Sequence, residues 1–547
     1  MSEVPSGWVA ATLEDIAKWS SGGTPSRSNP SYYSGTIPWL KTGELGPPVV
    51  FQTEEHISEE AVASSSAKIF PKGSVAVAMY GATIGKASIL GIDAATNQAC
   101  AVGVPDASET KFLYYFLVSQ SEAFANAGKG GAQPNISQGI VKSWAISVPP
   151  LAEQTRIVEK LEELLSDLDA GVAELKAAQK KLAQYRQSLL KAAVEGALTA
   201  EWRAARAVGT ATIASSFPRK RESSILPGDI ASHMDSRLRG NDGNGETGGQ
   251  LLQRILTERR ARWEAKQLAK FNEQGKTPPK DWQKKYPEPV QPDTSGLPEL
   301  PEGWVWASVE QIASDEPYSL AIGPFGSNLK VPDYRESGVP LVFVRNIRSG
   351  NYGGTHTKYV TPEKAEELSA HRVDAGDVLI TKMGEPPGDA DVYPDGQPPA
   401  IITADCIKVR CWAGLVRPDL LKATINSHIG RQQIEPMTQG VAQKKVSLGR
   451  FTRLAVPVPP IQEQDELIAL LGAATRETAA QEAAVGLSLK QSTAQRQNIL
   501  RAAFAGQLVP QDPNDEPASV LLERIRAERA ARNKVKKPRG HITKGAA

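Results

Sequence analysis

The sequence predicts an α+β protein in which two pseudo-twofold-related α/β domains are separated by two long antiparallel coiled-coil helices. Three observations predict this fold class. The two halves share sequence segments, a proline pair in each half leads into a long segment without proline, and leucines in the first long segment recur every seven residues. The 547 residues are 40% hydrophobic and 23% charged, which is ordinary globular usage and excludes general disorder.

The shared segments occur in the same order in both halves. GWVAATLEDIA from Gly7 returns as GWVWASVEQIA from Gly303, residues 130–154 return as 440–464, and SLLKAAVEGALT from Ser188 returns as NILRAAFAGQLV from Asn498. The difference in residue number between matching segments grows in the predicted loops and stays constant through the predicted helices and strands. The two halves are therefore an imperfect tandem duplication of one structural unit.

Residues 1–150 and 301–460 are each expected to form one mixed domain. In the first, short Val- and Ile-rich runs at 74–79 and 99–104 alternate with glycine and proline turns, and an aromatic helix is expected around 111–126. The second domain repeats this scheme, including three glycines at corresponding turn positions.

Each domain is followed by a long helix, expected over 151–202 and 461–510. A heptad pattern of this length must pack on another helix, and the obvious partner is the other long helix of the same chain. At about 1.5 Å per residue each helix would reach roughly 75 Å. The residues expected to pack between the helices are Ile157, Leu161, Leu164, Leu168, Leu175, Leu182 and Leu189 from the first and Leu471, Val485 and Ile499 from the second.

The remaining residues form linkers and a shorter repeat. LLQRILTERRAR from Leu251 resembles LLERIRAERAAR from Leu521, and the smaller displacement of this pair indicates a 40-residue insertion in the linker 203–250. We expect a short helix and linker at 251–300, and a C-terminal helix with a basic tail at 511–547. The inserted text is rich in Arg, Ser, Gly and Asp, so a solvated loop without chemistry is expected. The alternative is a basic DNA-binding arm that uses Arg219, Lys220, Arg221, Arg237 and Arg239.

Motifs for catalysis and cofactor binding are near misses. GATIGK from Gly81 has three residues between its glycines where a phosphate loop has four, and Ala87 stands where a Ser or Thr would bind magnesium. Asn29-Pro30-Ser31-Tyr32 only superficially resembles the Asn-Pro-Pro-aromatic motif of amino-methyltransferases. The six histidines lie far apart in sequence, and no G-x-S-x-G elbow occurs. We expect no catalytic residue, no metal and no cofactor bound by this chain.

A duplicated pair of domains suits a linear, repeating ligand, and duplex DNA presents equivalent sites about 34 Å apart. Because the domains differ in sequence, the two half-sites that they read should differ. Lys and Arg donate to guanine edges and phosphates, and Asn and Gln pair with adenine. The candidate DNA-binding residues are Lys41, Thr42, Thr83, Lys86, Gln133, Asn135, Lys330, Arg345, Asn346, Lys382, Gln443, Lys444 and Lys445.

Net charge, cysteine count and hydropathy indicate the cellular compartment of the protein but do not identify its ligand. The net charge is only +2, which neither requires nor forbids a nucleic-acid partner. Three cysteines are too few for a disulfide framework or a zinc cluster. No stretch approaches about 18 apolar residues, and MSEVPSGWVA lacks a signal-peptide pattern. We expect a cytoplasmic protein without a membrane partner.

Several segments carry a family resemblance. They include SGGTPSRSNPSYYSGTIPWLKTGEL, YGATIGKASILGIDAATNQACAV and GVAQKKVSLGRFTRLAVPVPPIQEQ, together with the paired PPLAEQ and PPIQEQ that lead into the long helices. In these segments the chain resembles the specificity subunit of type I restriction-modification systems. The resemblance covers nearly the whole chain except the insertion and the Lys/Arg-rich tail. It implies target-recognition domains at 1–150 and 301–460, each reading half of a bipartite asymmetric sequence across a gap set by the helices.

The resemblance also implies partners. They are double-stranded DNA, two modification subunits that use S-adenosylmethionine to methylate adenine N6, and two motor-nuclease restriction subunits that use ATP and Mg. The chain itself would then be a non-catalytic subunit that directs them. Two alternatives stay open at this point: a stand-alone methyltransferase, and a coiled-coil scaffold or adapter without sequence-specific DNA reading.

Overall fold

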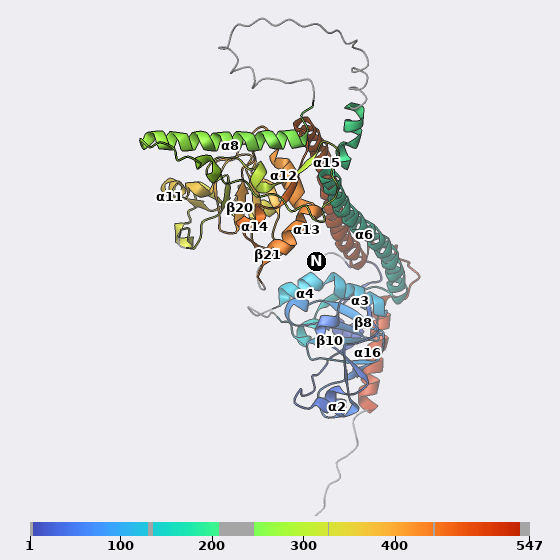
Figure 1. The fold of residues 1–547 in the computed structure, drawn as a ribbon. Helices are drawn as coiled ribbons and strands as arrows, with labels where there is room; N and C mark the ends of the chain where they lie inside the picture. Colours follow the sequence, from blue (N-terminus) through green and yellow to red (C-terminus); the bar gives the residue numbers. More distant parts are fainter. Residues whose placement is uncertain (1–3, 129–134, 207–244, 327, 441–443, 536–547) are drawn as a thin grey trace, which may run out of the picture. The chain divides into compact units, whose positions relative to one another are not determined.

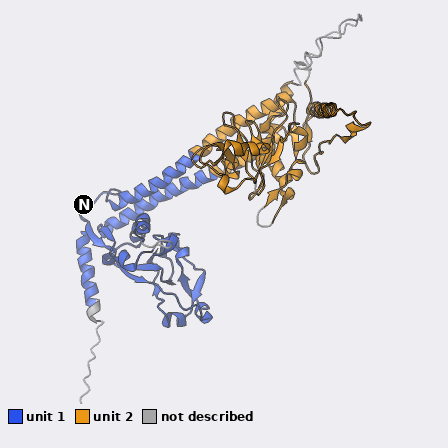
Figure 2. Ribbon diagram, turned by 90° about the vertical axis from the view of Figure 1, so that its left-hand side faces the viewer, with its two compact units in different colours: residues 1–178, 484–547 blue, residues 179–483 orange. Residues whose placement is uncertain are grey.

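The computed structural model describes residues 4–128, 135–206, 245–326, 328–440 and 444–535 (Figure 1). The chain divides into two units, one of residues 1–178 and 484–547 and the other of residues 179–483 (Figure 2). Each unit contains one mixed domain and parts of both long helices. The five basic residues that the sequence offers as an alternative DNA-binding arm within 203–250 lie outside the described residues.

The first domain contains two main sheets and a two-stranded sheet. The larger main sheet has the order β2 (Ala17–Ser21), β10 (Cys100–Pro105), β7 (Val75–Ala78), β8 (Ala87–Leu90) and β4 (Val49–Val50). The other has the order β5 (Glu55–Ile57), β3 (Ile37–Leu40), β9 (Ala94–Thr96) and β6 (Ile69–Phe70), and β1 (Val9–Thr12) pairs with β11 (Ala145–Val148). The two runs expected to be strands are β7 and β10, which pair antiparallel.

The expected aromatic helix forms as two helices, α3 (Thr110–Ser119) and α4 (Ser121–Ala127), joined at Gln120. α3 packs on β7 and β8 through buried Phe112, Leu113, Phe116 and Leu117. Strand β7 is buried on both faces, which explains why its sequence is continuously apolar instead of alternating between apolar and polar residues.

The second domain repeats most of this topology, but its larger main sheet has no counterpart of β4, and it has an additional two-stranded sheet of β21 (Thr438–Gln439) and β22 (Lys445–Val446). Its main sheets have the orders β13 (Leu320–Ile322), β20 (Cys406–Val409), β17 (Val378–Thr381), β18 (Ala390–Val392) and β15 (Tyr359–Val360), β14 (Val339–Val342), β19 (Ala400–Ile402), β16 (Arg372–Val373). β12 (Val305–Ser308) pairs with β23 (Ala455–Val458), and α12 (Pro418–Asn426) and α13 (His428–Met437) take the places of α3 and α4. The protein therefore has the two-domain, long-helix fold class that the sequence predicts.

The long helices are α6 (Leu151–Val194) and α15 (Ile461–Phe504), each of 44 residues. Within each unit they run antiparallel. Asp169 pairs with Arg496 in the first unit, and Arg186 lies 3.3 Å from Glu482 in the second. Of the residues expected between the helices, Ile157, Leu161, Leu189, Leu471 and Ile499 are buried, and Leu164, Leu168, Leu175, Leu182 and Val485 are half-buried. None of the described helices is long and apolar enough to cross a membrane.

Both long helices end earlier than the expected boundaries at 202 and 510. Gly196 and Gly506, two residues beyond the respective helix ends, have φ angles of 77° and 68°, in the left-handed region that glycine adopts easily at helix ends. A Cβ at Gly196 would lie 2.5 Å from Pro301 Cγ, and one at Gly506 would lie 2.6 Å from Pro5 Cγ. The close approach of a second chain segment therefore also requires glycine at both positions.

A further helix closes each domain. α8 (Gly248–Glu273) supplies Leu251, Leu252 and Ile255 to the core of the second domain, and α16 (Ala518–Val535) supplies Leu521, Leu522 and Ile525 to the core of the first. The first residues of these helices donate matching backbone hydrogen bonds, from Gly248 to Gly303 O at 2.6 Å and from Ala518 to Gly7 O at 3.0 Å. α8 is longer than the short helix expected within 251–300, because its second half packs against the returning chain at Trp282.

The two PPxxEQ segments anchor the long helices to the domains through buried side chains. Gln154 Oε1 accepts from Glu109 N at 2.8 Å, and Gln464 Oε1 accepts from Arg417 N at 3.0 Å. The preceding glutamates differ. In the second unit, Glu463 accepts from Trp304 Nε1 at 2.9 Å and from Thr199 Oγ1 at 2.7 Å, and it also pairs with Arg203.

Glu153, the counterpart of Glu463, lacks this network. Its Oε1 is buried and has no hydrogen-bond partner among the described residues, and neither has the Trp8 indole N–H. Val509 and Pro513 stand at the positions that correspond to Thr199 and Arg203, so two donors are lost. Burial raises the pKa of Glu153, and the neighbouring Trp8, Arg156 and Gln511 only partly oppose this shift. The ionised carboxylate therefore destabilises the first unit at neutral pH.

This contrast predicts opposite effects of one substitution at the two junctions. Glu153→Gln should raise the thermal unfolding temperature of the first unit at pH 8, and the gain should shrink as the pH falls, because the wild-type carboxyl then binds a proton in the folded state. Glu463→Gln should instead destabilise the second unit by about 1–3 kcal/mol, because it weakens bonds to a charged acceptor. Calorimetry of the full chain between pH 5 and pH 8 would check both. Equal losses of stability in the two variants would contradict the view that Glu153 destabilises its unit whereas Glu463 stabilises its own.

Candidate nucleic-acid interface

In each domain, the residue that directly follows a central strand of the larger main sheet forms backbone hydrogen bonds with two other loops. This residue is Met79 after β7 in the first domain and Lys382 after β17 in the second, and the two correspond in the sequence repeat. We call residues 22–26, 79–86, 97–99 and 135–137 loop cluster 1, and residues 323–326, 382–388, 403–405 and 444–447 loop cluster 2.

Backbone hydrogen bonds hold loop cluster 2 together. Lys382 N donates to Asp405 O at 2.7 Å, and Val446 N donates to Lys382 O at 3.0 Å. Met383 and Lys445 form an antiparallel bridge. Three loops that are distant in sequence are therefore fixed to the end of one strand.

The Lys382 side chain reinforces this arrangement. Its ammonium donates to Ala404 O at 3.0 Å and lies 4.8 Å from the centre of the Phe325 ring. Burial lowers the pKa of Lys382, and Asp405 partly opposes that effect. Phe325 is 61% exposed, so the cation lies beside an aromatic ring that is open to solvent. Such a ring can contact a thymine methyl group or stack on an unpaired base.

Loop cluster 1 has the same backbone with different side chains. Met79 N donates to Ala99 O at 2.8 Å, Ile136 N donates to Met79 O at 2.9 Å, and Tyr80 bridges to Asn135. Met79 is buried and carries no charge, whereas Tyr80 is 44% exposed. The first cluster therefore offers a phenol and an amide where the second offers a methionine and a lysine.

The structure brings some of the candidate DNA-binding residues together in these clusters. Lys86 and Asn135 are exposed in loop cluster 1, and Lys444 and Lys445 are exposed in loop cluster 2. Thr83, also in cluster 1, donates its hydroxyl to Tyr80 O at 3.0 Å. Gln133 and Gln443 lie outside the described residues.

Other candidates lie elsewhere, and the side chains of Lys41 and Arg345 are engaged in protein contacts. Lys41, beside Thr42 at the start of a short helical turn, forms ion pairs with Glu54 at 2.8 Å and Glu55 at 3.0 Å, and these bonds raise its pKa. Arg345 donates to His356 O at 2.9 Å, and the exposed Lys330 precedes another such turn.

The side chain of Asn346 is hydrogen-bonded within the protein. It is buried in α10 (Val344–Ser349), where its Oδ1 accepts from Phe343 N at 2.9 Å and its Nδ2 donates to Asn351 O at 2.8 Å. Both ends of the amide are therefore occupied within the domain.

Sequence reasoning missed Phe325, Tyr80 and Arg348. Arg348 Nε lies 2.7 Å from Asp389, which Arg431 also contacts at 2.5 Å, and Arg348 donates to Pro386 O at 3.0 Å. These bonds hold the turn that contains residues 384–388. A readable signal existed for Phe325, because it stands between two glycines in GPFGS; Arg348 and Asp389 are too far apart in sequence to be paired by eye.

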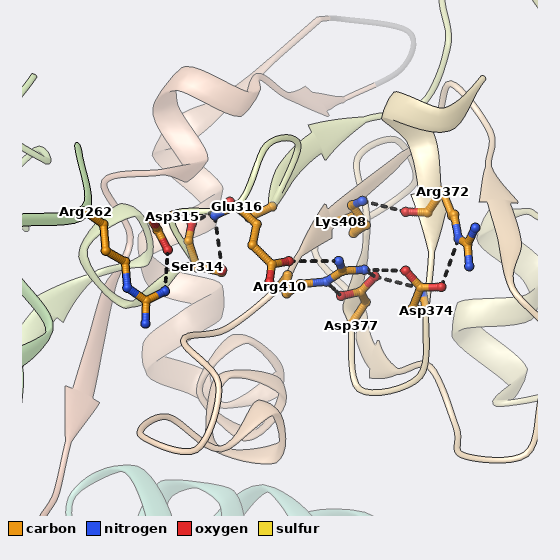
Figure 3. Close-up of polar contacts among 10 residues, drawn as sticks. Arg262, Ser314, Asp315, Glu316, Arg372, Asp374, Asp377, Lys408 and Arg410 are labelled. Carbon is orange, nitrogen blue, oxygen red and sulfur yellow. Dashed lines mark hydrogen bonds and ion pairs between the residues drawn. The ribbon is translucent and has the colours of Figure 1, made fainter. Parts of the chain in front are cut away.

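A charged network stabilises the other end of β17 and β20 (Figure 3). Arg410 contacts Asp377 at 2.8 Å, Asp374 at 2.7 Å and Glu316 at 3.2 Å, and these carboxylates raise its pKa. The buried Lys408 donates to Arg372 O at 2.5 Å, and burial lowers its pKa. The strands that carry loop cluster 2 are therefore fixed at both ends.

The cysteines are buried and unpaired. Burial raises the pKa of Cys100, Cys406 and Cys411 to about 12 in each case, so these thiols stay protonated at neutral pH. Within the part of the chain that the structure describes, no group of three His, Cys, Asp or Glu side chains is arranged to hold a metal ion.

Comparisons with known proteins agree on one family. Residues 5–177 match the model of the type I restriction modification DNA specificity domain. The chain is 32% identical over 189 residues to the EcoR124I/EcoR124II specificity subunit of Escherichia coli, an alignment that covers 32% of this chain and only 47% of that relative. It is 22% identical over 546 residues to the EcoDI specificity subunit of Escherichia coli, with 97% of each chain covered.

A solved structure supports the same fold. It comes from a study of complex assembly and conformational transition in a type I restriction-modification system, and its matching chain has a TM-score of 0.59 at 16% identity. The match covers 93% of this chain and 100% of that chain. The two-domain architecture is therefore shared along nearly the whole length.

The contacts predict different roles for two of the candidate residues. Asn346→Ala should destabilise the second unit by about 1–3 kcal/mol, because it removes two hydrogen bonds in a buried cap. Lys445→Gln should change stability by less than about 0.5 kcal/mol, because the side chain is exposed, and should weaken DNA binding instead. Thermal unfolding combined with a DNA-binding titration would separate the two effects. An unaltered melting temperature for Asn346→Ala would contradict the structural role.

Proposed function

Because the chain belongs to the family of type I restriction-modification DNA specificity subunits, we propose that it reads a bipartite, asymmetric DNA target and directs partner subunits to it. Loop cluster 1 would read one half-site and loop cluster 2 the other. The long helices would set the unread gap between the half-sites.

The observation that carries this proposal is the repetition of one loop framework with different side chains. Met79 and Lys382 make matching backbone hydrogen bonds, yet one is a buried thioether and the other a cation beside an exposed ring. Tyr80 and Asn135 correspond to Met383 and Lys445 in the two bridges. A common framework suits a common ligand, duplex DNA, and the differing side chains favour different base edges.

The partner roles are also part of the proposal. Two modification subunits that use S-adenosylmethionine would methylate adenine N6 at the chosen site, after they take the base out of the stack. Two motor-nuclease subunits that use ATP and Mg would cleave the DNA. This chain would hold none of those cofactors and would supply only the choice of sequence, in the cytoplasm where chromosomal DNA lies.

Replacing one domain tests the division of labour. When residues 1–150 are exchanged for the corresponding domain of another specificity subunit, one half of the methylated motif should change and the other half should stay. The reciprocal exchange of residues 301–460 should alter the complementary half. Sequencing of methylated adenines in cells that also express the modification subunit would report both.

Three results of that experiment would count against the proposal. A change in both half-sites after one exchange would show that the domains do not read independently. An unchanged motif after both exchanges would place recognition elsewhere. Stable complexes with no sequence preference at all would favour the coiled-coil scaffold.

A further inference from the structure

Residues 259–285, from the second half of α8 and the chain that returns from it, form a strongly basic segment, which we call the basic arm. It contains nine Lys and Arg residues and three Asp and Glu residues, in a chain whose net charge is +2. The segment alone therefore carries a net charge of +6, which exceeds the net charge of the whole chain.

Aromatic side chains hold the basic arm in one conformation. The rings of Trp263 and Trp282 stack with centres 5.8 Å apart, and Phe271 meets Trp282 edge-on at 6.1 Å. Tyr286, just beyond the arm, meets Trp263 at 5.4 Å. The lysines on the returning chain are thus fixed relative to those on α8.

Several charges of the basic arm are already neutralised. Arg262 lies 3.1 Å and Lys266 lies 3.0 Å from Asp315 (Figure 3 shows the Arg262 pair), and Lys284 lies 3.1 Å from Asp281. Arg260 contacts Glu264 at 3.2 Å and Glu288 at 3.3 Å.

Four exposed lysines of the basic arm form no ion pair with any carboxylate in the described part of the chain. Lys276 donates to Gln274 Oε1 at 3.2 Å, which leaves Lys270, Lys280 and Lys285. Lys270 lies on α8, and Lys280 and Lys285 lie on the chain that returns from it, so both segments of the basic arm carry exposed positive charge.

A cavity of about 630 Å³ lies between the basic arm and residues 286–317. Its lining includes Arg259, Trp263, Lys266, Lys270 and Tyr286, together with the acidic Glu273, Glu310 and Asp315. Arg259 donates to the backbone carbonyls of Glu310 and Ala313 and has no carboxylate partner among the described residues. The corresponding Arg529 forms a bidentate ion pair with Asp106. The Arg259 guanidinium is therefore held by backbone carbonyls, whereas its counterpart in the other half is paired with a carboxylate.

The basic arm occurs once, although the fold around it occurs twice. The sequence repeat between α8 and α16 ends at Arg262 and Arg532, and Asn533 stands where Trp263 would be expected. Neither Trp282 nor Tyr286 has a counterpart in the residues that follow. The arm is thus not part of the duplicated reading machinery.

We propose that the basic arm binds the phosphate backbone of duplex DNA without reading its sequence. The inference rests on the proposed function, because it supplies a sequence-independent grip to a subunit that reads DNA through its loop clusters. Exposed lysines fixed on a rigid frame neutralise phosphates and release counterions, so their contribution shows in the salt dependence of binding.

The test uses the full chain bound to its modification subunits and the triple variant Lys270→Gln, Lys280→Gln and Lys285→Gln. Affinity for a random-sequence duplex is measured over a range of salt concentrations. The slope of log affinity against log salt should fall by about 0.9 for each lysine that contacts a phosphate. The methylated motif should not change. The matched variant with arginine at the same three positions keeps the charge and should keep the slope.

The outcomes separate this inference from the proposed function. An unchanged slope in the glutamine variant overturns the DNA contact, and so does loss of the modification subunits with DNA binding otherwise intact, because the arm would then bind protein. If the wild-type complex prefers no sequence in a random pool, the proposed function fails instead. The slope comparison on random duplex still decides the basic arm in that case.

Discussion

The architecture depends on one constraint: each domain completes its hydrophobic core with residues from both halves of the sequence. In the first unit, Ile157 and Leu161 from the start of α6 and Leu500 and Ala503 from the end of α15 are buried in the same core as the sheet. Phe504 packs edge-on against Phe112 and Phe116, at 5.3 Å from each ring. Burying an apolar side chain of this size contributes about 1.5–3 kcal/mol, so detaching either helix would expose much of the core.

This constraint explains how one framework can serve two different recognition tasks. Because helices and sheets fix the ends of β7 and β17, the loops beyond them keep their backbone hydrogen bonds when side chains change. Lys382 shows the freedom that results. Its backbone makes the same hydrogen bonds as that of Met79, while its largely buried ammonium lies beside the exposed Phe325 ring. Variation at such positions alters the ligand preference without disturbing the fold.

The fold was largely predictable from the sequence, and the candidate site only partly. Period and repetition are local signals, so the duplication and both long helices can be predicted, although the predicted helices extend past the glycines that follow each helix end. Engagement of side chains depends on tertiary contacts. Nothing near Lys41 in sequence shows that Glu54 and Glu55 return to neutralise it, and nothing near Asn346 shows that its amide caps a buried turn.

The central claim is that this chain chooses the sites at which partner subunits act. The most direct measurement is a genome-wide map of methylated adenines in cells that express the modification subunit with and without this chain. The account predicts a bipartite motif that appears only when the chain is present. Stable assembly with the same methylation pattern in both cells would contradict it.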